Sequence, residues 1–521
     1  MILSLLRYNI ETNLVGLILN LHPKYRLRMV DQSKKILLAA MLCAGLLAYS
    51  PAQAQTQDQN KPQKTTWTLQ ECVEYGLQNN LLLKQSGLNR ELAFINAKQA
   101  RNNVLPSVNA STSYSFNSGL NNDPTTGVLV NSNTRTNNIQ LNANVPIFNG
   151  FQLHNSIKQT YLNYQASLSD LEKTQNDVLL NIVSQYLEII LSDELLEAAK
   201  LQLASSKDQA ARTQKLFQAG SVAENNVFEI NSQIATDEVS IINAQNRRDI
   251  AAVNLMQLLD LQNLPDFKVV KPDIKDPDED VIAFDADNVF DVAQQRMPEI
   301  KAADLRAKSA LVGIRVSQGA LMPQLSLGAN FNTAHFNLLT DRVVDPGPEV
   351  TTIQTIGYVD GGEKYPVKTA ITRRQPVTED YTYFTQLQDN RGIGVFLNLS
   401  IPVFNGFSAR NGVLRSKINH KNAVLNTEIT RNQLRQTIQQ SYADAVAAQK
   451  RFSAMKKQLE SFQLTFRNAE IRFNNGVLNS TDYNVARNNF TRAQLDLIQA
   501  KYEYTFRLKV LDFYQGKKIT F

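Results

Sequence analysis

The chain has 521 residues, with 54 Lys or Arg against 48 Asp or Glu, and a formal net charge of +6. Residues 1–54 hold six basic and two acidic side chains and so contribute +4 of that charge. The rest of the chain is close to neutral and has no basic stripe interleaved with aromatic residues, which argues against nucleic-acid binding.

A leader is predicted at residues 1–54. Lys34 and Lys35 precede an uncharged apolar run at 36–49, and small residues then lead to Ala54, a pattern typical of a secretory signal peptide cleaved after Ala54. The run is shorter than the roughly 20 apolar residues that a membrane-spanning helix needs. Met29 is an alternative translation start. The sequence therefore predicts an exported protein.

Two short strand alternations follow the leader, at 107–116 and 139–145, and two more occur at 325–331 and 393–401. In each, apolar residues alternate with residues that are mostly polar or small; Phe396 is the exception in the fourth. Lipid-facing strands need about 9–11 such residues. A soluble sheet with one face on a core would show the same pattern. In an outer membrane, four strands would need other copies to complete a barrel, because lipid tolerates no open sheet edge and bacterial barrels have at least about eight strands.

A seven-residue phrase ends the second strand region and returns after the fourth. It reads Val-Pro-Ile-Phe-Asn-Gly-Phe at 145–151 and Ile-Pro-Val-Phe-Asn-Gly-Phe at 401–407, 256 positions apart (401 − 145). The same offset relates Gly220 to Gly476, and an offset of 217 (301 − 84) relates Lys84 to Lys301. The sequence therefore predicts an internal twofold repeat of helix, two strands and long helical hairpin. The predicted strand-to-helix junction residues are Pro146, Phe148, Gly150, Pro402, Phe404 and Gly406. We expect Phe148, Phe151, Phe404 and Phe407 to lie just past the strand ends.

Long helices are predicted at 151–218 and 409–474, each about 100 Å at roughly 1.5 Å per residue. Gly220 and Gly476 are placed to end them before the chain reverses. Coiled-coil scaffolding would show the same periodicity.

The chain accordingly divides into five parts. These are a leader at 1–54, a first repeat at 55–262, an irregular, equatorial-type linker at 263–285, a second repeat at 286–513 and a C-terminal tail at 514–521. The second repeat contains a long outer loop at 334–390, for which a partial lid and a simple solvated loop are both open.

The repeated layout, the Pro-hydrophobic-Phe-Asn-Gly phrase and the predicted helix at 69–80 together resemble the TolC family of outer-membrane efflux proteins. The resemblance covers nearly all of 67–513. It implies a mixed α and β membrane protein: a homotrimer in which four strands per chain form a twelve-stranded β-barrel that continues as a long α-helical barrel. It also implies residence in the outer membrane of a Gram-negative bacterium, with the helices in the periplasm. The implied partners are a periplasmic membrane-fusion (adaptor) protein and an inner-membrane RND or ABC-type pump.

The resemblance also implies a periplasmic gate of acidic residues after the second glycine turn. Asp482 fits the first acidic position, whereas the second falls at Val485. Three copies of Asp482 would favour cations in a narrow pore. Asn226 and Glu224 are the corresponding candidates in the first repeat. Alternatively, Asp482 is a first-turn acid stabilised by the helix dipole. The turn residues expected to contact the adaptor are Gly220, Ser221, Val222, Gly476, Val477 and Leu478.

The predicted function is a passive exit duct for a tripartite efflux or type I secretion system. The alternative is a barrel-anchored structural or adhesive coiled-coil surface protein. We expect no enzyme activity, cofactor or metal: His154, His335 and His420 lie on separate predicted elements, and the sequence has neither a phosphate-binding glycine loop nor a nucleophile elbow.

Overall fold

The structure is a computed structural model that describes residues 65–122, 127–261, 267–272, 285–360 and 362–517. The predicted leader lies outside the described residues, as do 262–266 and 273–284 of the linker region and the end of the tail. The first half of the described chain contains β1 (Thr66–Trp67), α3 (Leu69–Asn79), α4 (Leu81–Asn102), β2 (Ser107–Asn122), β3 (Leu129–Asn149), α5 (Gln152–Gln218), α6 (Glu224–Leu258) and β4 (Lys268–Val269).

The second half contains α7 (Ala286–Arg296), α8 (Pro298–Gly319), β5 (Gln324–Phe336), β6 (Asp341–Asp345), β7 (Glu349–Asp360), β8 (Lys364–Arg374), β9 (Val377–Asp380), α9 (Tyr383–Asp389), β10 (Gly392–Ser400), α10 (Ser408–Asn474) and α11 (Ser480–Tyr514). Apart from the seven-residue α9, the described helices come in pairs of equal length. Helices α3 and α7 have 11 residues, α4 and α8 have 22, α5 and α10 have 67, and α6 and α11 have 35. The long helices therefore begin and end within one residue of their predicted bounds.

Four strands form an antiparallel sheet in the order β10-β5-β3-β2. Strands β2, β3 and β5 have 16, 21 and 13 residues and exceed the predicted length. The excess in β2 and β3 has a simple origin, because these strands continue to pair with each other beyond Thr136, where the pairing of β3 with β5 stops.

Strand β3 also continues through the repeated phrase. A bulge between Pro146 and Phe148 shifts the register, and Phe148 pairs with Leu325 inside the sheet. The predicted position of Phe148 past the strand end was therefore wrong, whereas Phe404 lies beyond β10 as expected. Pairing of β3 with β2 stops at Asn144, so Pro146 lies where β3 has one free edge and a missing N–H is tolerated.

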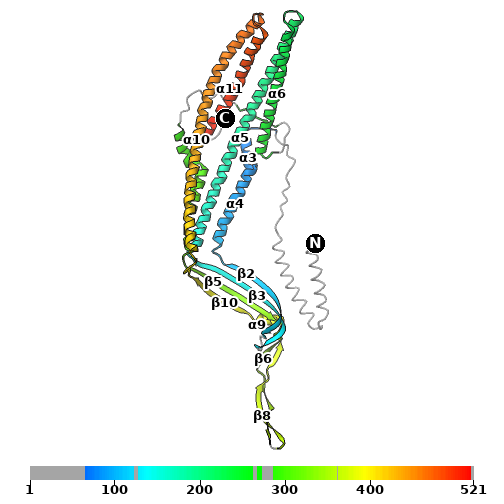
Figure 1. Cartoon of the computed structure of the whole chain (residues 1–521), viewed down its shortest axis with the longest axis vertical. Helices are drawn as coiled ribbons and strands as arrows, with labels where there is room; N and C mark the ends of the chain where they lie inside the picture. Colours follow the sequence, from blue (N-terminus) through cyan, green and yellow to red (C-terminus); the bar gives the residue numbers. More distant parts are fainter. Residues whose placement is uncertain (1–64, 123–126, 262–266, 273–284, 361, 518–521) are drawn as a thin grey trace. The chain divides into compact units, whose positions relative to one another are not determined.

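The predicted outer loop at 334–390 is not a simple loop. Strand β6 pairs with β9, β7 pairs with β8, and α9 follows (Figure 1). Gln386 of α9 is 1% exposed and fastens the base of this arm: its Oε1 accepts from the Phe336 N–H at 2.9 Å, and its Nε2 donates to the Leu339 and Tyr381 carbonyls. The arm is thus hydrogen-bonded to the end of β5.

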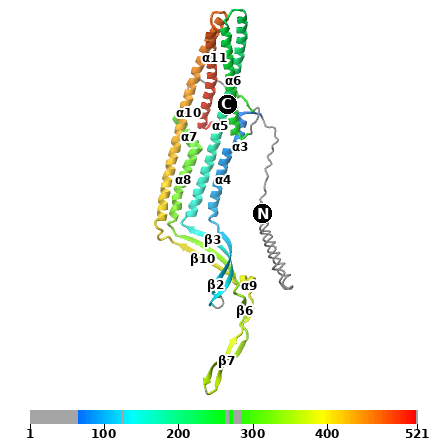
Figure 2. The ribbon, with the colours of Figure 1, turned by 45° about the vertical axis from the view of Figure 1, so that its right-hand side comes forward.

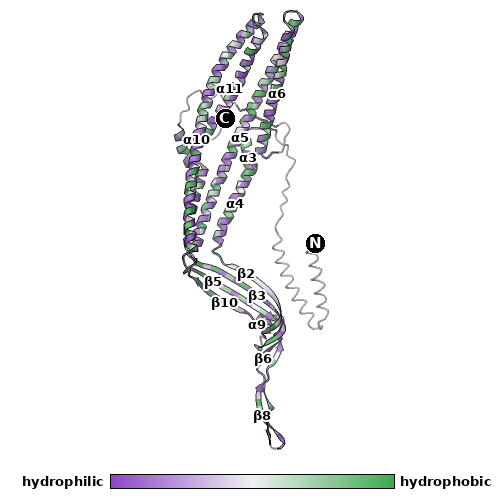
Figure 3. Cartoon of the chain, in the orientation of Figure 1, coloured by the Kyte–Doolittle hydropathy of each residue, from purple (hydrophilic) through white to green (hydrophobic). Residues whose placement is uncertain are grey.

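The helices pack in the same order as the strands. Helix α5 contacts α4 and α8, and α10 contacts α8, so the helices lie side by side in the order α10-α8-α5-α4. Each of them extends away from the sheet (Figures 1 and 2). Helices α6 and α11 complete the hairpins by packing on α5 and α10. None of these elements is uniformly apolar (Figure 3). Among the described residues, no helix combines the length and apolarity needed to cross a bilayer.

The largest core cluster lies where α3, α5 and α6 meet. Ile182, Ile189, Leu255 and Leu259 are fully buried there. Gly76 of α3 permits this approach, because a Cβ at that position would lie 2.4 Å from Ile182 Cδ1. The predicted linker contains a short strand that sequence analysis did not anticipate, since β4 pairs in parallel with β1 beside this core.

Candidate functional site

The four-stranded sheet has one apolar and one polar face. Residues paired across strands point to the same side. One cross-strand row is Ala110, Leu141, Phe331 and Ile393, and the adjacent row on the opposite face is Asn109, Asn142, Asn330 and Gly394. Ile393 is 81% exposed and lies on an edge strand. The alternations predicted from sequence therefore combine into continuous faces.

The polar face is kept shallow by glycines. A Cβ at Gly328 would lie 2.2 Å from the ring of Phe396, and one at Gly394 would lie 2.3 Å from Asn330 Oδ1. The neighbouring side chains therefore lie flat over the glycines rather than standing up from the sheet. Such a polar surface suits the wall of an aqueous passage.

The Asn-Gly-Phe part of each phrase turns the chain from strand to helix. Asn149 Oδ1 accepts from the Leu153 N–H at 3.2 Å, which satisfies one of the free donors at the start of α5. Gly150 and Phe151 then both have left-handed φ angles, 63° and 61°. Gly406 and Phe407 repeat this geometry at 60°, and Phe404 contacts Phe407 edge to face at 5.6 Å, as Phe148 contacts Phe151 at 5.2 Å. The predicted junction residues are thus brought together, and the asparagines were missed although the phrase contains them.

The two copies of the junction differ in their neighbours. A Cβ on Gly150 would lie 2.4 Å from the carbonyl oxygen of Gly319 at the end of α8. Among the described residues, and apart from the chain neighbours of Gly406, no atom lies within 4 Å of the corresponding position. The first junction therefore packs tightly within the chain, and the second has open space beside it.

Both hairpin turns have the same hydrogen-bonded form. The Ser221 N–H donates to Leu216 O and the Gly220 N–H to Phe217 O, at 2.8 and 2.9 Å. The Val477 N–H likewise donates to Arg472 O and the Gly476 N–H to Phe473 O. This is the Schellman motif, which requires a left-handed residue, and Gly220 and Gly476 supply it with φ angles of 70° and 73°. Gly220 and Gly476 thus follow the ends of α5 and α10, where the chain reverses.

The turns hold the exposed apolar surface expected of a contact site. Val477 is 67% exposed and Phe228 is 61% exposed. Ser221 is exposed, whereas Val222 and Leu478 are half-buried. Ser480 Oγ donates to Glu229 Oε2 at 2.9 Å, and Arg212 Nη1 donates to Asn474 Oδ1 at 2.7 Å, so the two hairpins contact each other near their ends.

The gate candidates lie in the first turns of α6 and α11. Asp482 is exposed, and its N–H donates to Asn479 Oδ1 at 2.7 Å while its Oδ2 accepts from Asn479 Nδ2 at 2.9 Å. Asn226 occupies the same helical position in α6 and is half-buried, and Glu224 is exposed. Asp482 therefore lies in the first turn of α11 and is hydrogen-bonded to the cap residue Asn479, and it still presents a carboxylate to solvent.

A buried polar cluster joins the hairpins further from the turns, and sequence analysis missed it. Arg487 of α11 is 2% exposed, and its Nη2 donates to Ser206 Oγ at 2.8 Å and to the Gln202 carbonyl at 3.0 Å. Ser206 in turn donates to the Asp237 carboxylate of α6. Burial lowers the pKa of the Arg487 guanidinium, and Tyr483 and Asp237 act in the opposite direction. A charged residue at a helix-packing position was the only signal in the sequence.

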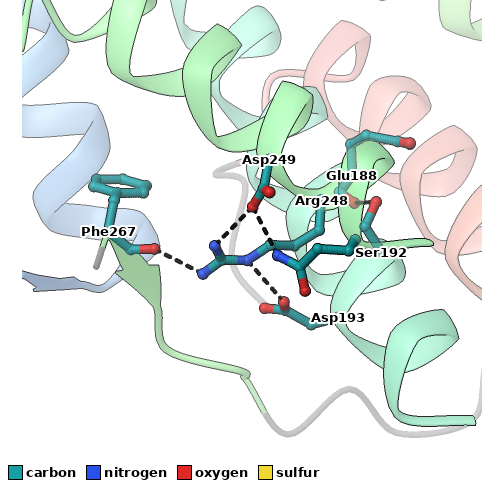
Figure 4. A network of polar contacts seen from close by, with 7 residues as sticks. Glu188, Ser192, Asp193, Arg248, Asp249 and Phe267 are labelled. Carbon is teal, nitrogen blue, oxygen red and sulfur yellow. Dashed lines mark hydrogen bonds and ion pairs between the residues drawn. The ribbon is translucent and has the colours of Figure 1, made fainter. Parts of the chain in front are cut away.

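A second polar cluster holds the start of the linker. Arg248 of α6 donates to Asp193 at 3.2 Å, to Asp249 at 3.2 Å and to the Phe267 carbonyl at 2.9 Å (Figure 4). The Tyr186 hydroxyl donates to the Val270 carbonyl. The described part of the linker is therefore fastened to the α5–α6 hairpin.

Within the described part of the chain, no group of three or more His, Cys, Asp or Glu side chains could hold a metal ion. The three histidines singled out above lie on α5, β5 and α10.

Comparison with known proteins decides the family. The model of the outer membrane efflux protein family matches residues 74–260 and 369–517. The chain belongs to this family. Toxin and drug export protein A of Aggregatibacter actinomycetemcomitans is 21% identical over 439 residues, which cover 83% of each chain. Outer membrane protein TolC of Escherichia coli strain K12 is 22% identical over 438 residues, covering 82% of this chain and 77% of TolC. The predicted relation to the TolC family is confirmed.

Solved structures of family members share the fold. A crystal structure of CusC matches with a TM-score of 0.68 and 17% identity over 86% of this chain and 92% of that chain. The CmeC outer membrane channel of Campylobacter jejuni matches with a TM-score of 0.64 and 17% identity over 86% and 85%. The arrangement of helices and strands described above is therefore an efflux-family arrangement.

Proposed function

We propose that the protein is the passive exit duct of a tripartite efflux or type I secretion system. It would sit in the outer membrane of a Gram-negative bacterium, with its helices in the periplasm, and conduct substrates expelled by an inner-membrane pump. The sheet carries this proposal: it has one apolar and one polar face, and its two edge strands pair with no further strand of the described chain. Lipid can accept the apolar face but not the edges. The family's efflux role favours the duct over the adhesive alternative.

A homotrimer would remove the edges. Strands β2 and β10 are the free edges of the sheet, and α4 and α10 are the ends of the helical row on the same sides. Both helices expose apolar side chains spaced for packing, among them Leu88, Leu92 and Ile95 on α4 and Leu414, Ile418 and Leu425 on α10. Joining β2 and α4 of one copy to β10 and α10 of the next would close both layers together. Three copies would then make a twelve-stranded barrel continued by a helical barrel.

The internal twofold repeat fits this closure. The paired helix lengths support the proposed repeats at 55–262 and 286–513. Helices α4 and α8 are equivalent in the two repeats, at an offset of 217. The end of α8 lies beside Gly150, so the end of the neighbouring copy's α4 would lie beside Gly406. The open space at Gly406 therefore supports a neighbour at that position.

The hairpin ends would contact the partners. Val477 and Phe228 offer exposed apolar area to a periplasmic adaptor, which would link the duct to an RND or ABC-type pump. Gly220, Ser221, Val222, Gly476 and Leu478 would shape that surface. At the same end, three Asp482 carboxylates would form a cation-selective ring. Val485 lies about one turn further on α11 and would add an apolar ring. Asn226 and Glu224 of α6 would lie between the Asp482 and Val485 positions of neighbouring α11 helices around the pore.

Single-channel recording tests the proposal. Protein without residues 1–54 would be reconstituted in planar bilayers, with its oligomeric mass measured in parallel. A trimer that conducts in small, cation-selective steps is expected. A trimer that never conducts, even after the turn at Gly476 is loosened, would refute the duct. Asp482→Asn should lower the cation selectivity while keeping the Oδ acceptor of the helix cap, and an unchanged reversal potential would remove Asp482 from the gate.

A further inference from the structure

The arm between β5 and β10 is longer and more apolar than a connection requires. Strands β7 and β8 form a ribbon with register from Glu349↔Arg374 to its tip. Its large apolar side chains are exposed, including Ile353 at 72%, Tyr358 at 64% and Tyr365 at 61%. Tyr358 and Val359 are sequence neighbours on opposite faces, and both are exposed. A two-stranded ribbon is marginally stable alone in water, so this one is expected to have a partner.

The ribbon also has two unpaired edges. Its sheet contains only β7 and β8 among the described residues, so the outer side of each strand presents free backbone donors and acceptors. Such edges pair readily with another strand.

The charges on the two strands specify which edges attract. Strand β7 carries two acidic residues and no basic one, whereas β8 carries Lys364, Lys368, Arg373 and Arg374 and no acidic one. Pairing β8 with a second β8 would oppose cations, and pairing β7 with a second β7 would oppose anions. Only β7 against β8 brings opposite charges together, as Glu349 and Arg374 already show within one ribbon at 3.4 Å.

We propose that β7 of one copy pairs with β8 of the next, so that the ribbons of three copies form a six-stranded collar at the outer mouth of the duct. This inference rests on the proposed trimer, since the main sheet would close by the same head-to-tail order, β2 against β10. The arm leaves the sheet at the end away from the helices, where all three ribbons would emerge together. Side chains fill the interior of an eight-stranded barrel, so a closed six-stranded collar would obstruct the exit.

Cross-linking between differently tagged copies tests the pairing. Within a ribbon Ile353 pairs with Ala370, and both are exposed. In a threefold arrangement, Ile353 of one copy lies level with Ala370 of the next. One copy would carry Ile353→Cys and the other Ala370→Cys, with a short bismaleimide as the reagent. Each variant has one cysteine on the arm, and Cys72 is buried. A product that carries both tags is expected.

The matched control is Ile353→Cys on both copies. In the proposed collar these positions are two strands apart, about 9.7 Å or more, so the yield should be far lower. Adding Lys364→Glu and Lys368→Glu to the Ala370→Cys copy should reduce the mixed product about threefold. Equal yields from the control would refute the β7-to-β8 order.

Excision of the arm gives a second readout. The Gln375 N–H donates to the Pro348 carbonyl at 3.1 Å, so a short turn can replace 349–374. The shortened protein should remain trimeric and conduct more than the full chain. If the full chain is a conducting trimer that gives no mixed product, and excision leaves conductance unchanged, the collar is refuted and the duct stands. Free ribbons that bind another surface protein would give that result. A monomer would refute both proposals.

Discussion

The close approach of Gly150 to Gly319 should dominate the stability of the strand-to-helix junction. Gly150→Ala would place a Cβ at a φ of 63°, which costs about 1–2 kcal/mol for an L-residue. The same Cβ would lie 2.4 Å from Gly319 O and 2.8 Å from Met322 Cβ. Overpacking of this kind costs about 1–3 kcal/mol. The free energy of unfolding should therefore fall by about 2–5 kcal/mol per chain.

Two other glycines separate these contributions. Gly406→Ala has a φ of 60° but no neighbouring atom within 4 Å, so within one chain it should cost only the backbone strain of about 1–2 kcal/mol. Gly412→Ala lies inside α10 with open space, and should stabilise the helix by about 0.5–1 kcal/mol.

Urea unfolding in detergent, followed by the circular dichroism of the helices, would rank the variants. If the dependence of the unfolding free energy on urea concentration is the same for all variants, their midpoint urea concentrations rank their stabilities. A loss for Gly150→Ala no larger than that for Gly406→Ala in the dissociated chain would refute the tight contact, because backbone strain alone would then account for it. An added loss for Gly406→Ala in the trimer, absent from the dissociated chain, would show that a neighbouring copy fills the space beside Gly406.

Three further predictions concern buried polar groups. Asp237→Ala leaves the Ser206 hydroxyl without its acceptor and removes the nearby negative charge that favours the buried Arg487 cation, and should cost about 3 kcal/mol in urea unfolding. A loss no larger than that of the exposed control Glu238→Ala would contradict the role given to this cluster. Gln386→Leu removes three hydrogen bonds at the base of the arm and should make residues 337–385 several-fold more sensitive to limited proteolysis. Gln388→Leu is the control and should leave the cleavage rate unchanged. Equal cleavage rates for the two variants would show that other contacts hold the arm. Burial raises the pKa of the Tyr483 and Tyr514 hydroxyls, so above pH about 10 the unfolded state binds fewer protons than the folded state. The free energy of unfolding therefore falls as the pH rises in that range. Tyr483→Phe should make that fall less steep, and an unchanged dependence of stability on pH would argue against the raised pKa of Tyr483.

Local patterns in the sequence were enough to place the long helices and the strand faces. A period of two or of about 3.6 residues, together with glycine and proline at the turns, depends on neighbours along the chain. Helix α5 begins and ends within one residue of its prediction for this reason, and Gly220 and Gly476 end their helices as expected. The repeated phrase marked both junctions because each needs a capping asparagine and a left-handed glycine.

Tertiary structure decided the features that depend on distant residues. The bulge after Pro146 lies in the pairing of β3 with the distant strand β5, where β3 no longer pairs with β2. The arm depends on pairing of β6 with β9 across more than thirty residues. The Arg487–Ser206–Asp237 cluster joins three helices, and a charged residue at a helix-packing position does not by itself show which partners surround it. The sequence by itself determined the elements and their repetition, because these arise from local backbone preferences and periodicity. The tertiary structure alone decided which polar groups are buried, which strand edges are unpaired and which glycines have unfilled space beside them. These properties depend on contacts between residues that are far apart in the sequence.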